Sequence, residues 1–138
     1  MSIKVYIDTN VYLNSIENRD KEISKKVLTF LEARDIKIFV NDLSVINIHY
    51  ITRKSIDRKL IKVELKKILS KHGLVPIDRF IIENSLDSEF KDFEDGVQYF
   101  CAKRVEADLI ITNNPKDFTT SEIKIMTPIE FYEEYIED

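Results

Sequence analysis

Short apolar runs rich in isoleucine and valine recur along the chain, and longer segments with helical spacing separate them. The runs lack the clean apolar–polar alternation of a strand with one solvated face, so they are typical of strands buried on both faces of a sheet. The strands predicted in this way are Ile3–Ile7, Ile36–Val40, Leu74–Ile77, Asp108–Thr112 and Ile123–Met126.

The segments between the runs place their apolar residues on one side of a helix. In 19–34, Ile23, Val27 and Leu31 fall at i, i+4 and i+8, which is the spacing of a single helix face. The same reasoning extends to three further segments. Helices are predicted over 19–34, 42–54, 57–70 and 79–88.

Capping signals define two of the helix starts. Asn41 or Asp42 is expected to cap the helix over 42–54. Thr127–Glu130 combines a capping box with a proline, which predicts a final helix beginning at Pro128. Strands that alternate with helices indicate an α/β fold with a largely parallel sheet and helices on both faces.

Composition adds limits to this picture. The chain has 138 residues with only two glycines and three prolines, and no repeat or Gly/Ser linker divides it, so we expect one domain over residues 1–138. No apolar run is long enough to span a bilayer, and no signal-peptide layout is present. Cys101 is the single cysteine; it cannot form an internal disulfide, and a cytoplasmic location is expected.

Charge is unevenly distributed. The net charge of −4 argues against indiscriminate nucleic-acid binding, yet residues 53–72 hold eight lysines and arginines against two acids. Within that segment, Lys59, Lys62 and Lys66 share one side of the predicted helix at i, i+3 and i+7. They are candidate phosphate contacts, and an ordinary solvated helix face is the alternative interpretation.

Asp8 is the first acidic candidate. It ends the first strand-like run, and the chain turns apolar again at Val11 after only Thr9 and Asn10. Asp8 fits as the cap of a short helix beginning near Val11, but Thr9 or Asn10 would cap that helix equally well. Ligands of parallel α/β sheets collect beyond the carboxyl ends of the strands, where Asp8 and also Asn114 stand. A functional role is therefore the second interpretation of Asp8.

Asp95, in the segment 91–118, is the second acidic candidate. Asp92 is a good N-cap, which places Asp95 at the third helical position, where the helix dipole favours an anion. Apolar residues flank Asp95 on both sides of the helix, however, so we expect it to lie in a partly enclosed place and to need a cation. Glu94 is either a helper or a solvated acid, and Asp117 is either a turn residue or a functional group.

Together these acids put oxygen ligands after two strands and on the helix between them, at what would be one edge of the sheet. Such a cluster is what Mg²⁺ or Mn²⁺ needs. Other chemistries lack their residues: His49 and His72 have no metal-ligand spacing, and there is no Gly-rich phosphate loop, no GxGxxG and no CxxC. Cys101 lies on an apolar helix stripe and is expected in the core.

With these residues in place, the chain resembles the PIN-domain family, which includes the VapC-type toxins of toxin–antitoxin systems. The resemblance runs in order over "YIDTNVYL", "NDLSVINIHYITRK" and "DFEDGVQYFCAKRVEADLIITNNPKDF", and the third stretch is similar to a branch that carries DFED. It implies a three-layer α/β/α sandwich with a mainly parallel five-stranded sheet. It also implies an Mg²⁺- or Mn²⁺-dependent ribonuclease acting on RNA, an antitoxin partner, and homodimers.

The resemblance also assigns roles by position. Asp8 matches the acid after the first strand, Asn10 the polar residue that follows it, and Asp95 the acid on the helix. Asn114 stands where many members carry aspartate, and Asn47 where most carry an acid, usually glutamate. The resulting predictions are catalytic residues Asp8, Asp95, Asn114 and Asn47, metal ligands Asp8, Asp95, Asn114 and Asp117, and substrate-binding residues Asn10, Thr112, Lys59, Lys62 and Lys66.

Two other functions fit parts of the sequence. An amide oxygen can ligate a hard cation but brings no charge and cannot act as a base, so Asn47 and Asn114 favour a PIN-like module that binds RNA or a protein without cutting. A haloacid-dehalogenase-like phosphotransferase also carries Asp at the end of its first strand. That chemistry needs a second Asp two residues later, where this chain has Asn10.

Overall fold

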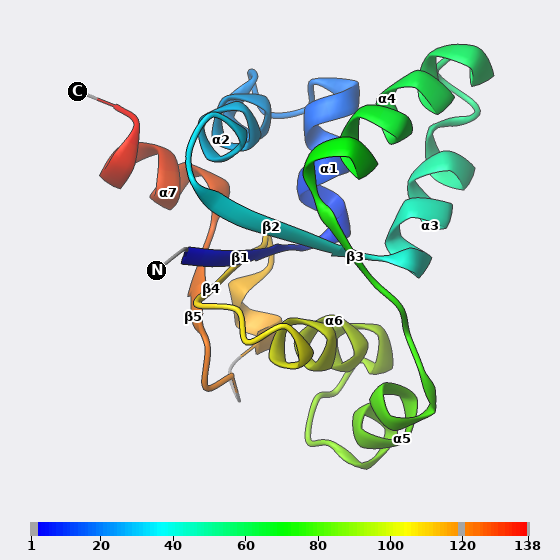
Figure 1. The fold of residues 1–138 in the computed structure, drawn as a ribbon, viewed down its shortest axis with the longest axis vertical. Coiled ribbons are helices and arrows are strands. Elements are labelled where there is room, and N and C mark those ends of the chain that lie inside the picture. Colours follow the sequence, from blue (N-terminus) through cyan, green and yellow to red (C-terminus); the bar gives the residue numbers. More distant parts are fainter. Residues whose placement is uncertain (1–2, 119–120, 138) are drawn as a thin grey trace.

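One five-stranded sheet organises the molecule, a computed structural model that describes residues 3–118 and 121–137 (Figure 1). The strand order is β3-β2-β1-β4-β5, and all four strand pairs are parallel. The strands are β1 (Ile3–Ile7), β2 (Ile36–Asn41), β3 (Gly73–Val75), β4 (Leu109–Ile111) and β5 (Lys124–Met126). All five predicted strands are present, and the last three are shorter than expected.

The helices alternate with the strands along the chain. They are α1 (Thr9–Glu17), α2 (Ile23–Glu32), α3 (Asp42–Thr52), α4 (Arg58–Lys71), α5 (Arg79–Asp87), α6 (Phe93–Arg104) and α7 (Pro128–Tyr135), with a short 3₁₀ helix η1 (Pro115–Phe118). No helix in the described ranges is long and apolar enough to cross a bilayer.

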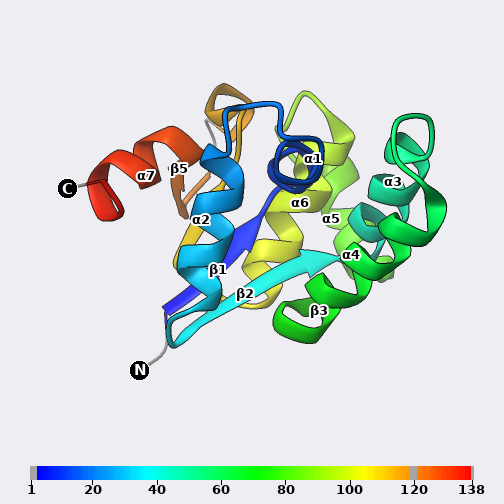
Figure 2. The same ribbon diagram turned by 90° about the horizontal axis from the view of Figure 1, so that it is seen from above.

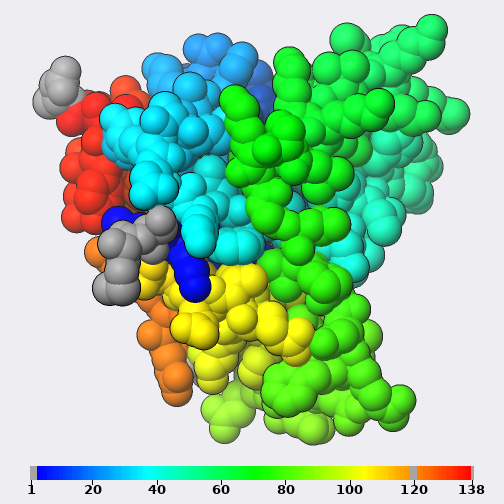
Figure 3. Space-filling model, viewed as in Figure 1, coloured from blue at the N-terminus to red at the C-terminus, as the bar shows by residue number. Residues whose placement is uncertain are grey.

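The helices cover both faces of the sheet and make a three-layer α/β/α sandwich. Helices α1, α2 and α4 lie over one face, and α5 and α6 lie under the other (Figures 1 and 2). In the space-filling view, the green residues form one continuous band that runs from the top of the molecule to its lower right, where α5 lies (Figure 3). The α/β/α class inferred from the sequence is confirmed.

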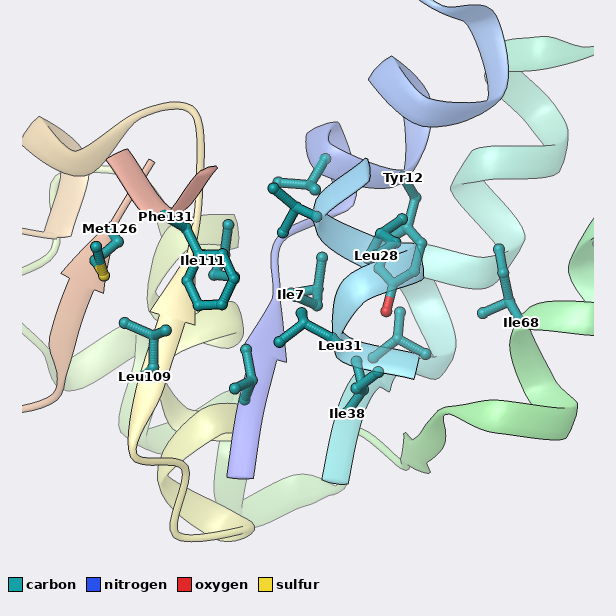
Figure 4. Packing of buried hydrophobic residues seen from close by; sticks show 14 of the residues in the cluster. Ile7, Tyr12, Leu28, Leu31, Ile38, Ile68, Leu109, Ile111, Met126 and Phe131 are labelled. Carbon is teal, nitrogen blue, oxygen red and sulfur yellow. The ribbon is translucent and has the colours of Figure 1, made fainter. Parts of the chain in front are cut away.

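Two buried clusters match the two faces. The first packs strand residues such as Ile7 and Ile111 against Leu31 of α2 and Phe131 of α7 (Figure 4). The second packs Tyr6 and other strand residues against α5 and α6, and it includes Cys101. The thiol is fully buried, which confirms its expected place in the core, and desolvation raises its pKa to about 12.

Two helix starts differ from the sequence-based expectation. Helix α1 begins at Thr9 rather than near Val11. The segment 19–34 is helical only from Ile23 to Glu32. Helix α1 ends at Glu17, and Asn18, Lys21 and Glu22 in the connection that follows adopt left-handed backbone conformations. That conformation ends a helix and delays the next one.

The other expected caps are present. Asn41, not Asp42, caps α3, and its side chain accepts a hydrogen bond from the Ser44 backbone N–H. Thr127 and Glu130 form the predicted capping box at the start of α7. These local signals fix where the chain leaves the sheet edge, and so where the polar residues of that edge lie.

Candidate active site

Strands β1 and β4 are neighbours at the middle of the sheet. From β1 the chain continues to β2 on one side, and from β4 it continues to β5 on the other, so the carboxyl ends of β1 and β4 form the topological switch point of the sheet. Asp8 follows β1 and Thr112 follows β4. The Asp8 backbone N–H donates to the carbonyl of Ile111 at 3.0 Å, so the pairing continues one step beyond the assigned strand. This bond places Asp8 at the crevice between the two strand ends.

The Asp8 side chain is buried, with 6% of the residue exposed. Asp8 occupies the N-cap position of α1, yet its side chain makes no capping hydrogen bond. Its Oδ2 instead accepts from the Thr112 hydroxyl at 2.7 Å. Burial raises the pKa of Asp8, and the Thr112 hydrogen bond works in the opposite direction by stabilising the charged form. The carboxylate is therefore held for a purpose other than capping.

Thr112 connects Asp8 to a second site residue. Its side chain is fully buried, and its hydroxyl oxygen also accepts from the Asn114 backbone N–H at 3.1 Å. Predicted as a substrate contact, Thr112 lies beneath the surface in this structure and acts on the site through its neighbours.

Replacing Thr112 with valine should destabilise the protein by about 1–3 kcal/mol, because a buried carboxylate loses its donor. The pKa of Asp8 should rise further. The loss should therefore be larger at pH 8 than at pH 4, because the hydrogen bond stabilises the charged form of Asp8, whose population grows as the pH rises. Urea unfolding at both pH values measures this, and Thr112→Ser, which keeps the hydroxyl, is the control. An equal loss at both pH values would contradict the coupling to Asp8.

Asp95 lies in a partly enclosed place, as expected. Asp92 caps α6 by accepting from the backbone N–H groups of Glu94 and Asp95. The pKa of Asp95 is raised to about 7, first by desolvation and then by the surrounding acids Asp92, Asp117, Asp8 and Glu94. Desolvation and repulsion from these carboxylates together outweigh the favourable field of the helix N-terminus.

One pocket of about 250 Å³ collects most of the predicted site. The candidate residues that line it are Asp8, Asn10, Asn47, Glu94, Asp95 and Asn114. Asp117 and Lys116 line a neighbouring hollow of about 360 Å³, which shares Asp95 with the first. Lys59, Lys62 and Lys66 are exposed on α4 and do not line the pocket.

Further pocket residues were not anticipated from the sequence. Thr9, Asn41, Ser44 and Gln98 line its polar side, and Leu43, Ile51, Phe93 and Val97 its apolar side. The sequence pattern would place Phe93 on the apolar stripe that carries Cys101, and this is wrong, since Phe93 is 44% exposed and lines the pocket. Helical spacing could have pointed to two of these residues, because Ser44 stands three residues before Asn47 and Gln98 three residues after Asp95.

The oxygen donors of the pocket fit a hard divalent cation in an open site. Within residues 3–118 and 121–137, no three carboxylate, imidazole or thiolate side chains are placed to form a closed metal cage. The pocket instead offers the carboxylates of Asp8 and Asp95 and the amide oxygens of Asn47 and Asn114. Such a set suits an ion that keeps several waters. The raised pKa of Asp95 agrees, since crowded carboxylates hold a proton when no cation offsets their charge.

A parallel α/β/α sandwich with acidic and amide oxygens at its switch point defines the class of this protein. A PIN domain family model matches residues 4–116, and the chain belongs to the PIN-domain family. It is 27% identical to Ribonuclease VapC1 of Aquifex aeolicus (strain VF5), a match that covers 97% of this chain and 96% of the relative.

Solved structures agree on the fold. A toxin–antitoxin complex from Klebsiella pneumoniae contains a chain with a TM-score of 0.69 and 21% identity, covering 90% of this chain and 97% of that one. VapBC2 from Rickettsia felis, bound to a DNA fragment from its promoter, has a TM-score of 0.68 and 18% identity, covering 91% and 98%. At these identities the likeness establishes the architecture alone.

Proposed function

We propose that this chain is an Mg²⁺- or Mn²⁺-dependent endoribonuclease and the toxin of a toxin–antitoxin pair. The observation that carries the proposal is the meeting of Asp8 and Asp95 in one pocket at the carboxyl edge of the sheet. Family membership and full-length similarity to a protein named Ribonuclease VapC1 support it.

The chain's own residues divide the work of such a site. Asp8 and Asp95 hold the cation, and Asn47 and Asn114 add neutral oxygens as ligands or orient water. Thr112 keeps Asp8 pointed at the site through its 2.7 Å hydrogen bond. When bound, the cation supplies Lewis acidity and positive charge at the scissile phosphate. Asp117 adds negative charge from the neighbouring hollow.

The pocket walls set how RNA would bind. No lysine or arginine of the described ranges lines this pocket, so the protein itself offers little attraction for phosphate there. Phe93, Leu43 and Ile51 instead offer apolar surface, each more than 40% exposed, on which a base can rest. The exposed row of Lys59, Lys62 and Lys66 would contact phosphates of RNA that continues beyond the pocket, and Asn10 would contact the nucleotide at its mouth.

An antitoxin protein is the proposed partner, since the solved structures of the same fold include toxin–antitoxin complexes. Large apolar side chains beside the pocket suit a protein partner, among them Ile46 (64% exposed) and Tyr50 (62% exposed) on α3. Homodimerisation, also expected from the family resemblance, stays a prediction.

Purified protein should cleave an unstructured RNA when Mg²⁺ or Mn²⁺ is present and stop when a chelator is added. Cleavage is read on denaturing gels with an end-labelled oligonucleotide, and a DNA strand of the same sequence serves as the substrate control. Cleavage that persists unchanged in chelator would contradict a metal-dependent nuclease. RNA binding without metal-dependent cleavage would favour the second candidate, a PIN-like binding module. The neutral side chains of Asn47 and Asn114 are the features that favour this candidate.

A further inference from the structure

One neutral side chain on the polar wall of the pocket is hydrogen-bonded to residues of four elements, β1, β2, α1 and α3. Gln98 of α6 accepts through Oε1 from the Tyr6 hydroxyl and from Asn41 Nδ2, the latter at 3.2 Å. Its Nε2 donates to Thr9 Oγ1 at 3.0 Å and to Ser44 Oγ at 3.2 Å. Both N–H groups and both acceptor positions of the amide are thus in use.

The partners of Gln98 are also bonded to each other. The hydroxyls of Thr9 and Ser44 lie 2.6 Å apart, and Asn41 Nδ2 donates to Tyr6 Oη at 2.9 Å. Tyr6, Asn41 and Ser44 are each at most 1% exposed. A buried polar network with every member satisfied favours a single arrangement, because any other leaves polar atoms unpaired out of reach of water.

Three members of this network, Thr9, Ser44 and Gln98, each stand next to a residue of the candidate site. Gln98 stands one helical turn after Asp95 on α6, so the two share a helix face. Ser44 stands one turn before Asn47 on α3, so these two also share a face. The α1 member directly follows the acid of β1. The pairs are Thr9 with Asp8, Ser44 with Asn47, and Gln98 with Asp95.

We propose that Gln98 is a positioning residue, which sets the spacing of the oxygens of Asp8, Asn47 and Asp95 by joining the first turns of α1 and α3 to the second turn of α6. The inference rests on the proposed metal-dependent function. The requirement is for an amide, because Oε1 must accept while Nε2 donates. Methionine has similar length and fills the space but makes none of these bonds.

If one of these helices shifts, the site oxygen next to it shifts as well. A displacement near 1 Å costs on the order of 100-fold in rate. Gln98→Met should therefore weaken Mn²⁺ binding at least tenfold. It should also lower kcat for RNA at saturating Mn²⁺ while KM stays within about threefold, since the apolar walls of the pocket remain.

The control is Ser24→Ala on α2. Ser24 is fully buried, and its hydroxyl donates to Asp20 at 2.5 Å, so its loss costs a buried hydrogen bond in a part of the protein that does not line the pocket. Ser24→Ala should lower the Tm and leave the Mn²⁺ Kd unchanged. A merely structural role for Gln98 would give the same result in Gln98→Met.

Titration calorimetry with Mn²⁺ alone, on the full chain, decides the matter. A Kd for folded Gln98→Met within twofold of wild type overturns the inference. If that variant does not fold, Tyr6→Phe removes one bond to Oε1, and a Kd that rises at least twofold supports the inference while an unchanged Kd overturns it. Wild type that binds Mn²⁺ without cutting RNA overturns the nuclease function alone, and wild type that binds no Mn²⁺ overturns both.

Discussion

Asp8→Asn and Asp95→Asn should each lower the rate of the proposed metal-dependent RNA cleavage by roughly 100-fold or more, while the protein remains folded. The pocket is lined by the carboxylates of Asp8, Glu94 and Asp95 and by amides that include Asn47 and Asn114, so each substitution removes a large share of the charge that attracts a divalent ion. The fold should tolerate both. Asp8 makes no capping bond, and at Asp95 the lost dipole contact, worth about 1 kcal/mol or less, is offset by relief from desolvation and from the neighbouring acids.

The reverse substitutions provide the matched control. Asn47→Glu and Asn114→Asp each add a carboxylate to the same pocket, so Mn²⁺ binding should tighten, because a full charge attracts a cation more strongly than an amide dipole does. Circular dichroism verifies folding, calorimetry gives the Kd, and gel assays give the rate. Strong cleavage by both Asp8→Asn and Asp95→Asn would refute the assigned mechanism.

Mn²⁺ affinity should fall about tenfold for each pH unit below pH 7, because a proton on Asp95 competes with the ion. The pKa of Asp95 is about 7, raised from 3.8 by desolvation and by its acidic neighbours. The folded state therefore holds this proton more tightly than the unfolded state does. It follows that the metal-free protein loses stability as the pH rises from about 4 to about 7.

Asp95→Asn separates these effects. Without the titrating carboxylate, the metal-free variant should be more stable than wild type at pH 8, by on the order of 1 kcal/mol after solvent screening is allowed for. The two should converge near pH 4, where Asp95 is protonated. Thermal unfolding across this range in chelator tests the sign. A variant that is less stable than wild type at pH 8 would show that Asp95 is not repelled by its neighbours.

Local patterns predicted most of the architecture. Buried isoleucine and valine runs gave all five strands, and the caps at Asp92 and Thr127 gave two helix starts. The errors lie where backbone conformation decides, as between α1 and α2, where Asn18, Lys21 and Glu22 adopt left-handed conformations. A helical wheel shows which residues share a face but not where that face leaves the protein core. Phe93 is the first residue of α6 and lines the pocket instead of the core.

The candidate site was predictable in its acids but not in their supports. Asp8 was recognisable because it interrupts an apolar stretch. Its partner Thr112 is 104 residues away, and Gln98 meets Tyr6 across 92 residues. Such pairs depend on which strands are neighbours, and a single sequence carries no signal for that. The lysine row on α4 shows the opposite case. The regular spacing of Lys59, Lys62 and Lys66 is plain in the sequence, and yet these residues do not line the pocket.

The central place of β1 has a consequence for synthesis on the ribosome. β1 is made first, but one of its two neighbours, β4, lies more than 100 residues later. A nascent chain released before β4 therefore carries Asp8 on an unprotected strand edge, without Thr112 to orient it. Sheets built from such distant partners form slowly and late. Under the proposed ribonuclease function, a growing chain would not cut the RNA around it, and activity would begin only after β4 has left the tunnel.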